Sequence, residues 1–264
     1  MASQNKIQEG ESFMAHRNNE WDEKSLGIKV NEIIEIEAKT EDLDNLIKNY
    51  LKYCSVNSVD FSTVRVNEED RKSRNILENN GFKMKEISYT VRTSKQKLNS
   101  NKSYNLIKNR LIKYKNEFAH LCTEDELLKL SFEMFDHGRF TEDPEINTSS
   151  CHRRNDQWAQ SLLKGKDKKL FLKINGKLAA FMFYQEKGNE ADLVLAGVAK
   201  EHRKSGAAYN LWVQVLSSLK EDAQIKTCIS AANFPILNLY MSLGFKVSEA
   251  LVGYHKFYSN EKPL

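Results

Sequence analysis

A hairpin followed by a regular alternation of strands and helices constrains the fold of this chain more than any other feature. Apolar and polar side chains alternate on both sides of Asn175-Gly176, and this dipeptide readily adopts the two positive φ angles of a type I′ turn. The order of elements predicts a mixed α/β sheet. The patterns read as strands at 169–174, 177–185, 191–198, 225–231 and 250–258, and as helices at 125–135, 156–163, 206–219 and 234–243.

The first half of the chain has a similar order of patterns. Strands are predicted at 30–38, 59–66 and 85–93, with helices at 41–54 and 70–80. A polar stretch rich in Lys, Asn and Ser at 94–103 separates this half from the second, and the residues up to 117 form a weak linking helix. We therefore expect two domains, residues 1–118 and residues 119–264.

The two halves also share a local motif. Residues 75–86 (NILENNGFKMKE) align without a gap with residues 238–249 (NLYMSLGFKVSE). A helix followed by Gly-Phe and a strand is a common unit, so both chance and duplication of an ancestral fold explain the match. The alignment places Leu77 opposite Tyr240, so any chemistry carried by Tyr240 is lost from the first copy.

Composition excludes several classes of function. The 40 basic and 36 acidic residues give a net charge of only +4, which does not argue for a nucleic-acid partner, although a pyrophosphate needs only a local basic patch. The cysteines lie too far apart for a metal site: Cys54, Cys122, Cys151 and Cys228. No stretch approaches the roughly 20 apolar residues of a membrane helix, and residues 1–20 lack a signal-peptide core. We expect a cytoplasmic protein with reduced thiols, no membrane partner and no metal.

Two segments carry residues suited to chemistry. A strand ending at Val198 leads through Arg203 and Gly206 into the helix that starts with Ala207 and Ala208. The unpaired N–H groups of a helix N-terminus suit a pyrophosphate, small residues allow its close approach, and an arginine adds a charge-assisted contact. A plain strand–helix loop packed against the sheet explains these residues equally well.

The second segment runs from Ser230 to Phe245. Asn233 fits a helix N-cap, and Pro235 is tolerated in the first turn. Tyr240 follows one residue short of two turns later, so it can face the same cleft as Asn233. A phenol there could give a proton to a departing thiolate. A tyrosine packed in the core, with its hydroxyl hydrogen-bonded, is the alternative.

Together these segments resemble the GNAT superfamily of N-acetyltransferases. Its CoA-binding motif, Arg/Gln-x-x-Gly-x-Gly/Ala, is matched by Arg203, Gly206 and Ala208, although Lys204 stands where a glycine usually follows the arginine. Its later motif is matched by Asn233, Tyr240, Gly244 and Phe245. The resemblance implies an α/β (α+β) fold with a mixed, mostly antiparallel sheet flanked by helices, and acyl-CoA as the donor.

A narrower resemblance covers most of the chain. Residues 21–30, 59–66, 135–146 and 156–162 are similar to nucleotide-sugar N-acyltransferases of the TDP-fucosamine acetyltransferase type. Those enzymes pair a degenerate N-terminal GNAT-like domain with a catalytic one, which implies a tandem GNAT-like fold here. It also implies a dTDP-linked amino-deoxysugar acceptor, a donor such as acetyl-CoA or 3-hydroxybutyryl-CoA, and a place in polysaccharide biosynthesis.

The resemblance assigns roles to particular residues. The acceptor amine would attack the thioester directly, with backbone N–H groups after Val194 stabilising the oxyanion. Tyr240 would protonate the thiolate, and Asn233 would support the pantetheine arm or a water. A covalent route through Cys228 is less favoured. The implied cofactor-binding residues are Leu195, Gly197, Val198, Arg203, Lys204, Ser205, Gly206, Ala207, Ala208, Asn233 and Tyr240.

The acceptor side is assigned less sharply. The resemblance points to His137, Arg139, Phe140, Glu142, Asp143 and Tyr184 as substrate-binding residues. Candidate general bases are His137, Glu142, Asp143, His152 and Glu68, each of which alone is more often a surface or capping group. The aromatic rings of Phe140, Trp158 and Tyr184 could stack on a base or sugar, and core packing is their alternative role.

Two other functions stay open at this point. One is a GNAT enzyme acting on another amine, such as a peptide, a polyamine or an aminoglycoside. The other is a non-catalytic CoA-binding relative that keeps the fold. An exposed edge strand near the C-terminus would also allow a homodimer, an expectation that rests on family habit.

Overall fold

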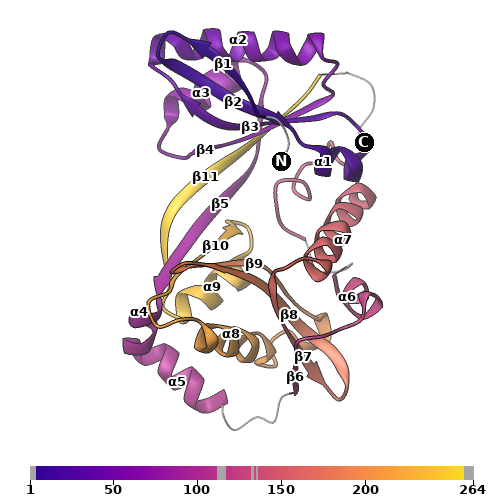
Figure 1. Cartoon of the computed structure of the whole chain (residues 1–264), viewed down its shortest axis with the longest axis vertical. Coiled ribbons are helices and arrows are strands. Elements are labelled where there is room, and N and C mark those ends of the chain that lie inside the picture. The colour runs from indigo at the N-terminus through magenta and orange to yellow at the C-terminus, as the bar shows by residue number, and fades with distance from the viewer. Residues whose placement is uncertain (1–3, 112–116, 132–133, 135, 259–264) are drawn as a thin grey trace. The chain divides into compact units, whose positions relative to one another are not determined.

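The computed structural model describes residues 4–111, 117–131, 134 and 136–258 (Figure 1). Contacts divide the chain into two compact units. Unit 1 comprises residues 1–88, 138–154 and 250–264, and unit 2 comprises residues 89–137 and 155–249. Each unit therefore contains segments from both predicted domains, residues 1–118 and residues 119–264. A boundary between two ancestral copies near residue 118 stays a prediction.

Unit 1 is a sheet with helices packed on it, and its strands follow the order β1-β2-β3-β4-β11-β5. Strands β3 and β4 are parallel, whereas the β1–β2, β2–β3 and β4–β11 pairs are antiparallel. Its elements are β1 (Gln4–Glu9), β2 (Ser12–Asn18), α1 (Glu20–Leu26), β3 (Val30–Glu37), α2 (Thr40–Val56), β4 (Phe61–Asn67), α3 (Arg71–Asn79), the start of β5 (Lys83–Ser94), the start of α7 (Thr148–Lys164) and the end of β11 (Lys246–Phe257).

Helix α2 shows why this unit folds as it does. Its buried side chains recur at helical spacing, which gives the helix one apolar face: Leu43, Leu46, Ile47, Tyr50 and Cys54. That face packs on the sheet in a core with Val64, Leu77 and Val252.

Unit 2 contains the predicted hairpin and the strand–helix alternation. Its strands follow the order β11-β5-β10-β9-β8-β7-β6. Asn175 and Gly176 have φ of 52° and 73°, as a type I′ turn requires. Its elements are the end of β5, α4 (Lys95–Ser100), α5 (Lys102–Leu111), β6 (Glu117–Ala119), α6 (Glu124–Ser131), the end of α7, β7 (Lys168–Ile174), β8 (Lys177–Lys187), β9 (Glu190–Val198), the 3₁₀ turn η1 (Lys200–His202), α8 (Ala207–Ser218), β10 (Gln224–Ser230), α9 (Phe234–Ser242) and the start of β11.

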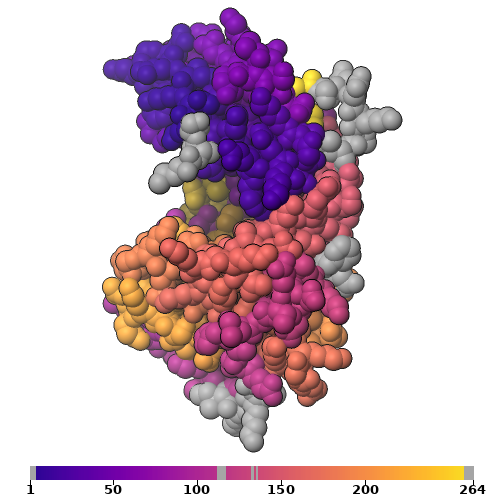
Figure 2. All heavy atoms as spheres, turned by 45° about the vertical axis from the view of Figure 1, so that its right-hand side comes forward, coloured from indigo at the N-terminus to yellow at the C-terminus, as the bar shows by residue number. Residues whose placement is uncertain are grey.

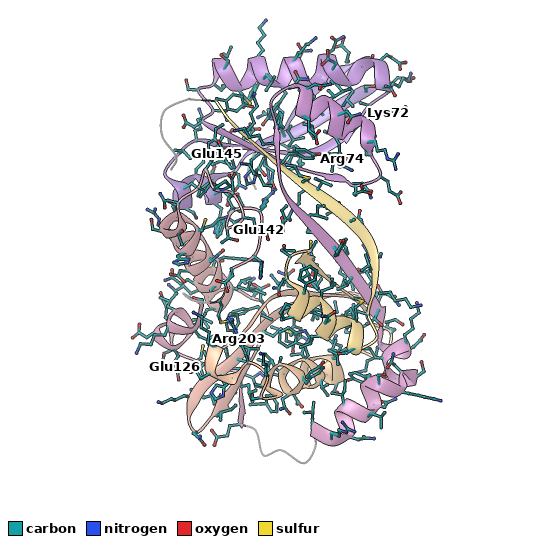
Figure 3. The ribbon with its side chains drawn as sticks, turned by 180° about the vertical axis from the view of Figure 1, so that it is seen from behind. Lys72, Arg74, Glu126, Glu142, Glu145 and Arg203 are labelled. Atoms are coloured by element: carbon teal, nitrogen blue, oxygen red, sulfur yellow. The ribbon has the colours of Figure 1, made fainter. Side chains whose placement is uncertain are left out.

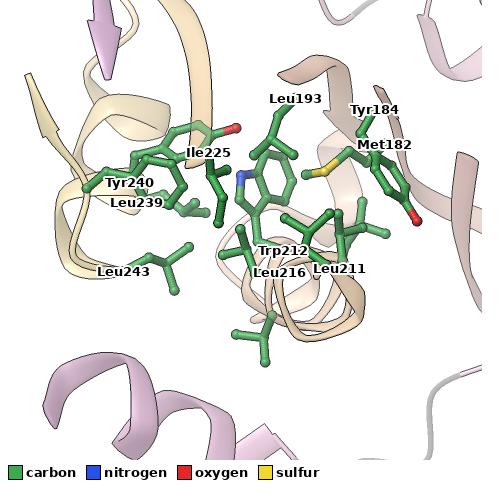
Figure 4. Close-up of a cluster of buried hydrophobic side chains, with 14 of the residues drawn as sticks. Met182, Tyr184, Leu193, Leu211, Trp212, Leu216, Ile225, Leu239, Tyr240 and Leu243 are labelled. Atoms are coloured by element: carbon green, nitrogen blue, oxygen red, sulfur yellow. The ribbon is translucent and has the colours of Figure 1, made fainter. Parts of the chain in front are cut away.

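The core of unit 2 lies between its sheet and helices α8 and α9. Trp212 and Leu216 of α8 pack there with Leu193 and Ile225 of the sheet (Figure 4). In the space-filling view, atoms cover the ribbons on the visible face of each unit (Figure 2). The α/β fold class, with a mostly antiparallel sheet flanked by helices, is confirmed.

The internal match between residues 75–86 and 238–249 is a repeated local structure. Gly81 and Gly244 both have positive φ, 82° and 92°. The N–H of Phe82 binds the carbonyl of Leu77 at 3.0 Å, and the N–H of Phe245 binds the carbonyl of Tyr240 at 3.0 Å. Both are the six-residue bond of a Schellman motif. Leu77 therefore occupies the position of Tyr240 in the other copy.

The strand that follows each of these motifs runs from one unit into the other. Strand β5 begins in unit 1 and ends in unit 2, whereas β11 begins in unit 2 and ends in unit 1. Strand β11 lies between β4 and β5, so the C-terminal strand is not a sheet edge. The expectation of an exposed edge strand near the C-terminus is therefore wrong. The homodimer itself stays an untested prediction.

Other differences from the sequence analysis concern segments without a strong pattern. Strands β1 and β2 and helix α1 were not predicted, and β11 starts at Lys246 instead of residue 250. Helix α7 is longer than the predicted 156–163. Of the helix predicted over 125–135, residues 132, 133 and 135 lie outside the described residues.

Candidate functional site

Strands β9 and β10 of unit 2 separate after a short paired region. Their parallel pairing covers Glu190–Asp192 and Gln224–Lys226, and no later residue of either strand pairs with the other within the described parts of the chain. Thr227 donates its hydroxyl to the carbonyl of Leu193 at 2.8 Å, just beyond the last pair. The backbone of β9 beyond this point offers polar groups that a ligand can pair with, because buried N–H and C=O groups need partners.

A β-bulge lies where the strands part. Leu193 stands opposite Tyr184 and Leu195 stands opposite Phe183, so Val194 is the extra residue of β9. A bulge re-aims the chain and is common beside active sites. The bulge interrupts the alternation of side chains between the two faces of the sheet. Leu193 belongs to the core beside α8, whereas Val194 and Leu195 both pack with the cluster on the other side of the sheet.

The loop between β9 and α8 has the backbone of an anion-binding turn. Lys204 has φ of 65° and Gly206, the N-cap of α8, has φ of 89°. Lys204 thus stands in the left-handed region where the family motif usually has glycine. Ser205 accepts a hydrogen bond from the N–H of Ala207, at 3.3 Å. The next N–H groups of the first turn, which have no partner within a helix, point from its positive end.

Arg203 extends from this loop and is exposed (Figure 3). Its Nε lies 3.5 Å from the carbonyl oxygen of Val198 at the end of β9. The guanidinium is therefore available beside the turn, where the sequence analysis expected a contact with the pyrophosphate.

Tyr240 and Asn233 lie on α9, next to the end of β10. Asn233 caps the helix by accepting from the N–H of Ile236 at 3.4 Å, so the predicted N-cap is confirmed. Tyr240 is 3% exposed, and its ring packs edge-on against Trp212 and Phe245. Burial raises the pKa of Tyr240 well above its usual range, against the opposing effect of Trp212 and Thr227. The phenol therefore stays protonated at neutral pH.

The sequence analysis missed Asp192 of β9. This residue stands in the last pair between β9 and β10, opposite Lys226 and two residues before the bulge. Burial raises the pKa of its carboxyl, an effect that nearby Lys226 opposes and Glu190 reinforces. The other described carboxyls with a resolved shift have a lowered pKa: Asp44, Glu126, Asp143 and Glu145. Raised carboxyl pKa values are typical of functional sites.

Asp192 and Tyr240 belong to opposite faces of the sheet. Ala191 and Leu193, the neighbours of Asp192 in the strand, lie in the same core as Tyr240. Because side chains alternate along a strand, Asp192 is directed to the other face. No sequence pattern distinguished it, since a single aspartate in an apolar strand carries no motif.

Gly197 is the last residue but one of β9. A Cβ on Gly197 would stand 1.6 Å from Cε of Met134, so the methionine side chain rests directly on the backbone of β9. Leu195 and Val198, two other predicted cofactor-binding residues, are each 8% exposed.

The predicted acceptor-binding residues are divided between the two units. His137 and Tyr184 belong to unit 2, whereas Arg139, Phe140, Glu142 and Asp143 belong to unit 1. Tyr184 is 8% exposed in the unit 2 core. Phe140 packs with Phe61 and Ile146 in a small apolar cluster. Both rings thus pack in apolar clusters, and their role in substrate binding stays a prediction.

The acidic residues among them already have partners in unit 1. Glu142 accepts from the N–H of Gly138 at 3.0 Å. Asp143 accepts from Lys85 through one oxygen and lies 2.7 Å from Nδ1 of His255 through the other. Hydrogen bonds from His255 and Lys85 lower its carboxyl pKa although burial raises it. Glu68, another candidate base, pairs with Arg74 at 2.8 Å. The roles of these residues as bases stay predictions.

Unit 1 has no counterpart of the long loop between β9 and α8. Only residues 38 and 39 connect β3 with α2, whereas residues 199–206 connect β9 with α8. Unit 1 also has Leu77 in place of Tyr240, as its Schellman bond shows. Among the residues that the structure describes, no helix is long and apolar enough to span a membrane, and no three side chains form a metal-binding group.

Comparisons agree with this geometry. Residues 142–254 match the family model described as an acetyltransferase (GNAT) domain. No curated protein matches the chain.

Solved structures show that the whole chain has a tandem GNAT fold. A tandem GNAT protein from the clavulanic acid biosynthesis pathway has a TM-score of 0.62 at 9% identity, covering 97% of this chain and 82% of that one. A GCN5-related N-acetyltransferase from Sphaerobacter thermophilus scores 0.61 at 12% identity, covering 93% and 76%. A GCN5-related glucosamine N-acetyltransferase region of a fungal multi-domain β-N-acetylglucosaminidase scores 0.61 at 15% identity, covering 92% and 31%.

Proposed function

We propose that unit 2 transfers an acyl group from acyl-CoA to an amine. The observation that carries this proposal is the separation of β9 from β10, with Tyr240 beside it on α9 and an anion-binding turn at the end of β9. The GNAT domain match over residues 142–254 spans all three features.

Acyl-CoA fits the polar groups of this region. The N–H groups at the start of α8, with Arg203, suit the pyrophosphate. The unpaired edge of β9 after Val194 suits the amide groups of pantetheine, which can take the place of a neighbouring strand. When bound, the donor supplies a thioester carbonyl, and N–H groups of β9 near the bulge would stabilise the oxyanion that develops on it.

The two proton transfers of the reaction then involve side chains on opposite faces of the sheet. The nitrogen of the amine forms a bond to the carbonyl carbon, and the carbon–sulfur bond breaks. Tyr240 gives its proton to the departing thiolate, a role suited to a phenol that burial keeps protonated. Asp192 accepts the proton that the amine loses, directly or through water. A carboxylate whose pKa is raised is a stronger proton acceptor than an unperturbed one.

For the acceptor we propose a nucleotide-linked amino sugar. The support is the resemblance of residues 21–30, 59–66, 135–146 and 156–162 to enzymes of that type. One structural neighbour is described as a glucosamine N-acetyltransferase region, and its likeness to this chain concerns the fold. A peptide, polyamine or aminoglycoside acceptor is equally compatible with the donor site.

A thiol-release assay tests donor and acceptor separately. The protein is given acetyl-CoA or 3-hydroxybutyryl-CoA with dTDP- and UDP-linked amino sugars, polyamines, aminoglycosides or short peptides. We expect turnover with one class of nucleotide sugar and direct binding of CoA by calorimetry. Turnover confined to a simple amine would keep the acyltransferase and overturn the sugar acceptor. Absence of CoA binding would overturn the proposal as a whole.

A further inference from the structure

Arg139 is a largely buried arginine of unit 1 with few hydrogen-bond partners. It belongs to the segment 138–154, and its side chain is 11% exposed. Its Nη1 donates to the hydroxyl of Thr63 on β4 at 2.9 Å, and its guanidinium lies 5.0 Å from the ring centre of Phe140. A guanidinium has five N–H donors in a planar fork, so Thr63 satisfies a small part of its hydrogen-bonding capacity.

The ion pairs around Arg139 show that it lacks a close counter-charge. Three neighbouring arginines each have a carboxylate within 3.0 Å: Arg17 with Glu32 at 2.9 Å, Arg65 with Glu86 at 2.9 Å, and Arg154 with Asp22 at 2.7 Å. The nearest carboxylate oxygen to Arg139 is also on Glu32 and lies 3.6 Å away. Glu32 is thus shared, and its shorter bonds go to Arg17.

The surroundings of Arg139 disfavour its charged form. Its pKa is lowered to about 10, chiefly by burial, with the charges of Arg65 and Arg154 acting in the same direction and those of Glu32 and Asp22 opposing them. A largely buried cation without a close counter-charge is costly. An anionic ligand would remove that cost, and a planar fork with free donors matches the oxygens of a phosphoryl group.

A second group beside Thr63 also lacks a partner. His255 of β11 is paired with Thr63 across the strands, and its side chain is fully buried. Its Nδ1 lies 2.7 Å from Asp143, a carboxylate that can only accept, so Nδ1 carries the hydrogen. Nε2 then carries a lone pair, and it has no hydrogen-bond partner in the described part of the chain. A buried acceptor of this kind calls for an explanation such as a ligand.

We propose that Arg139, Thr63 and His255 form a binding site in unit 1 for a phosphoryl group of a small-molecule ligand. Arg139 donates to the phosphoryl oxygens. Nε2 of His255 accepts from a hydroxyl on the phosphorus or on the adjoining part of the ligand. A carboxylate supplies no such donor, which favours phosphate chemistry. The site uses residues of unit 1 alone and does not depend on the acyltransferase proposed for unit 2.

Calorimetry with the full chain tests the site. Inorganic phosphate, pyrophosphate and dTDP are titrated separately into protein already saturated with CoA, so that the turn before α8 is occupied. We expect at least one of these anions to bind with one site per chain, and the Arg139→Gln variant to bind it at least ten-fold more weakly. Binding of phosphate or pyrophosphate alone would identify the phosphoryl group as sufficient, and binding of dTDP alone would identify a nucleotide.

The matched control is Arg153→Gln, which removes the same charge from the same segment. Arg153 is exposed and donates to Ser150 at 3.0 Å, so its variant should bind like the unaltered protein. A cooperative thermal unfolding transition, followed by circular dichroism, reports that the Arg139→Gln variant is folded. If that variant does not fold, Thr63→Val replaces it, with weakening of the same sign expected. Equal binding by the unaltered protein and a folded variant, or failure of all three anions to bind, would overturn the site.

Discussion

Nδ1 of His255 lies 2.7 Å from Oδ2 of Asp143, and neither side chain is exposed. The other oxygen of Asp143 accepts from Lys85 at 2.7 Å. These contacts join β11, β5 and the segment 138–154 inside unit 1 (Figure 3 labels Glu145 of the same segment, which also pairs with Lys85). Burial, more than any charge, lowers the pKa of His255 to about 4 from 6.5. The imidazole is therefore neutral at physiological pH.

We expect this pair to make the protein sensitive to acid between about pH 6.5 and pH 4. In that range the unfolded chain binds a proton at His255 and the folded chain does not, so the free energy of unfolding falls as the pH falls. The full difference amounts to roughly 3 kcal/mol for a shift of this size. Thermal melts at several pH values measure it.

The His255→Asn variant checks the origin of the slope. Asparagine keeps a donor near the position of Nδ1 but does not titrate, so the variant should lose most of the pH dependence in this window. His120→Asn is the control, because His120 is exposed and should leave the slope as it is. An unchanged slope in His255→Asn would assign the acid sensitivity to other groups.

Gly206→Ala should weaken CoA binding more than it weakens the fold. Gly206 has φ of 89°, so alanine costs on the order of 1 kcal/mol of stability there. A methyl group also stands where a pyrophosphate approaches the backbone, and we expect the Kd for CoA to rise at least ten-fold.

Gly188→Ala separates the two effects. Gly188 lies in the turn between β8 and β9 with φ of 61°, and a Cβ there, as at Gly206, meets nothing within 4 Å. This variant should lose similar stability and bind CoA normally. Equal losses of CoA affinity in both variants would mean that the turn at Gly206 has no particular role.

Tyr240→Phe should lower kcat by about 10²-fold and leave CoA binding intact, the size usual for loss of a general acid. The ring contacts with Trp212 and Phe245 are retained, so the fold should persist. Tyr104→Phe is a matched control in the same unit, since it removes a buried hydroxyl that bonds Ser217 at 3.1 Å. Unchanged turnover of Tyr240→Phe in the thiol-release assay would show that Tyr240 is a core residue only.

The sequence predicted the elements whose patterns are local. The Asn175-Gly176 turn and the cap at Asn233 each depend on a few neighbouring residues, and both appear as expected. The position of β11 between β4 and β5 could not be predicted, because its partners on β4 lie 184 to 196 residues away in the chain and local propensity carries no information about distant pairing.

The residues of the candidate site also differ in whether the sequence could reveal them. Gly206 and Tyr240 could be found because they belong to motifs with fixed spacing. Asp192 could not, since its environment arises from where β9 and β10 part. Asp143 illustrates the opposite case: a carboxylate that looked available in the sequence has Lys85 and His255 on its two oxygens.

Asp192→Asn tests the one site residue that only the structure identifies. The amide has the same shape as the carboxyl but cannot accept a proton, so we expect kcat/KM to fall by about 10²-fold. The activity of the unaltered protein should decline as the pH falls through the raised pKa of Asp192, and the variant should lack that acidic limb. Glu117→Gln is the control, since it neutralises an exposed carboxylate on another strand of unit 2.

Stability supplies a second measurement on the same variant. Because the folded chain holds the pKa of Asp192 above the value of 3.8 for a free carboxyl, ionisation opposes folding, and the destabilisation is complete once the pH exceeds the folded pKa. Asp192→Asn should therefore raise the melting temperature at pH 7 while lowering activity. A residue that lowers stability but raises activity is expected to have a role in the reaction. A variant that loses both stability and activity would assign Asp192 a structural role instead.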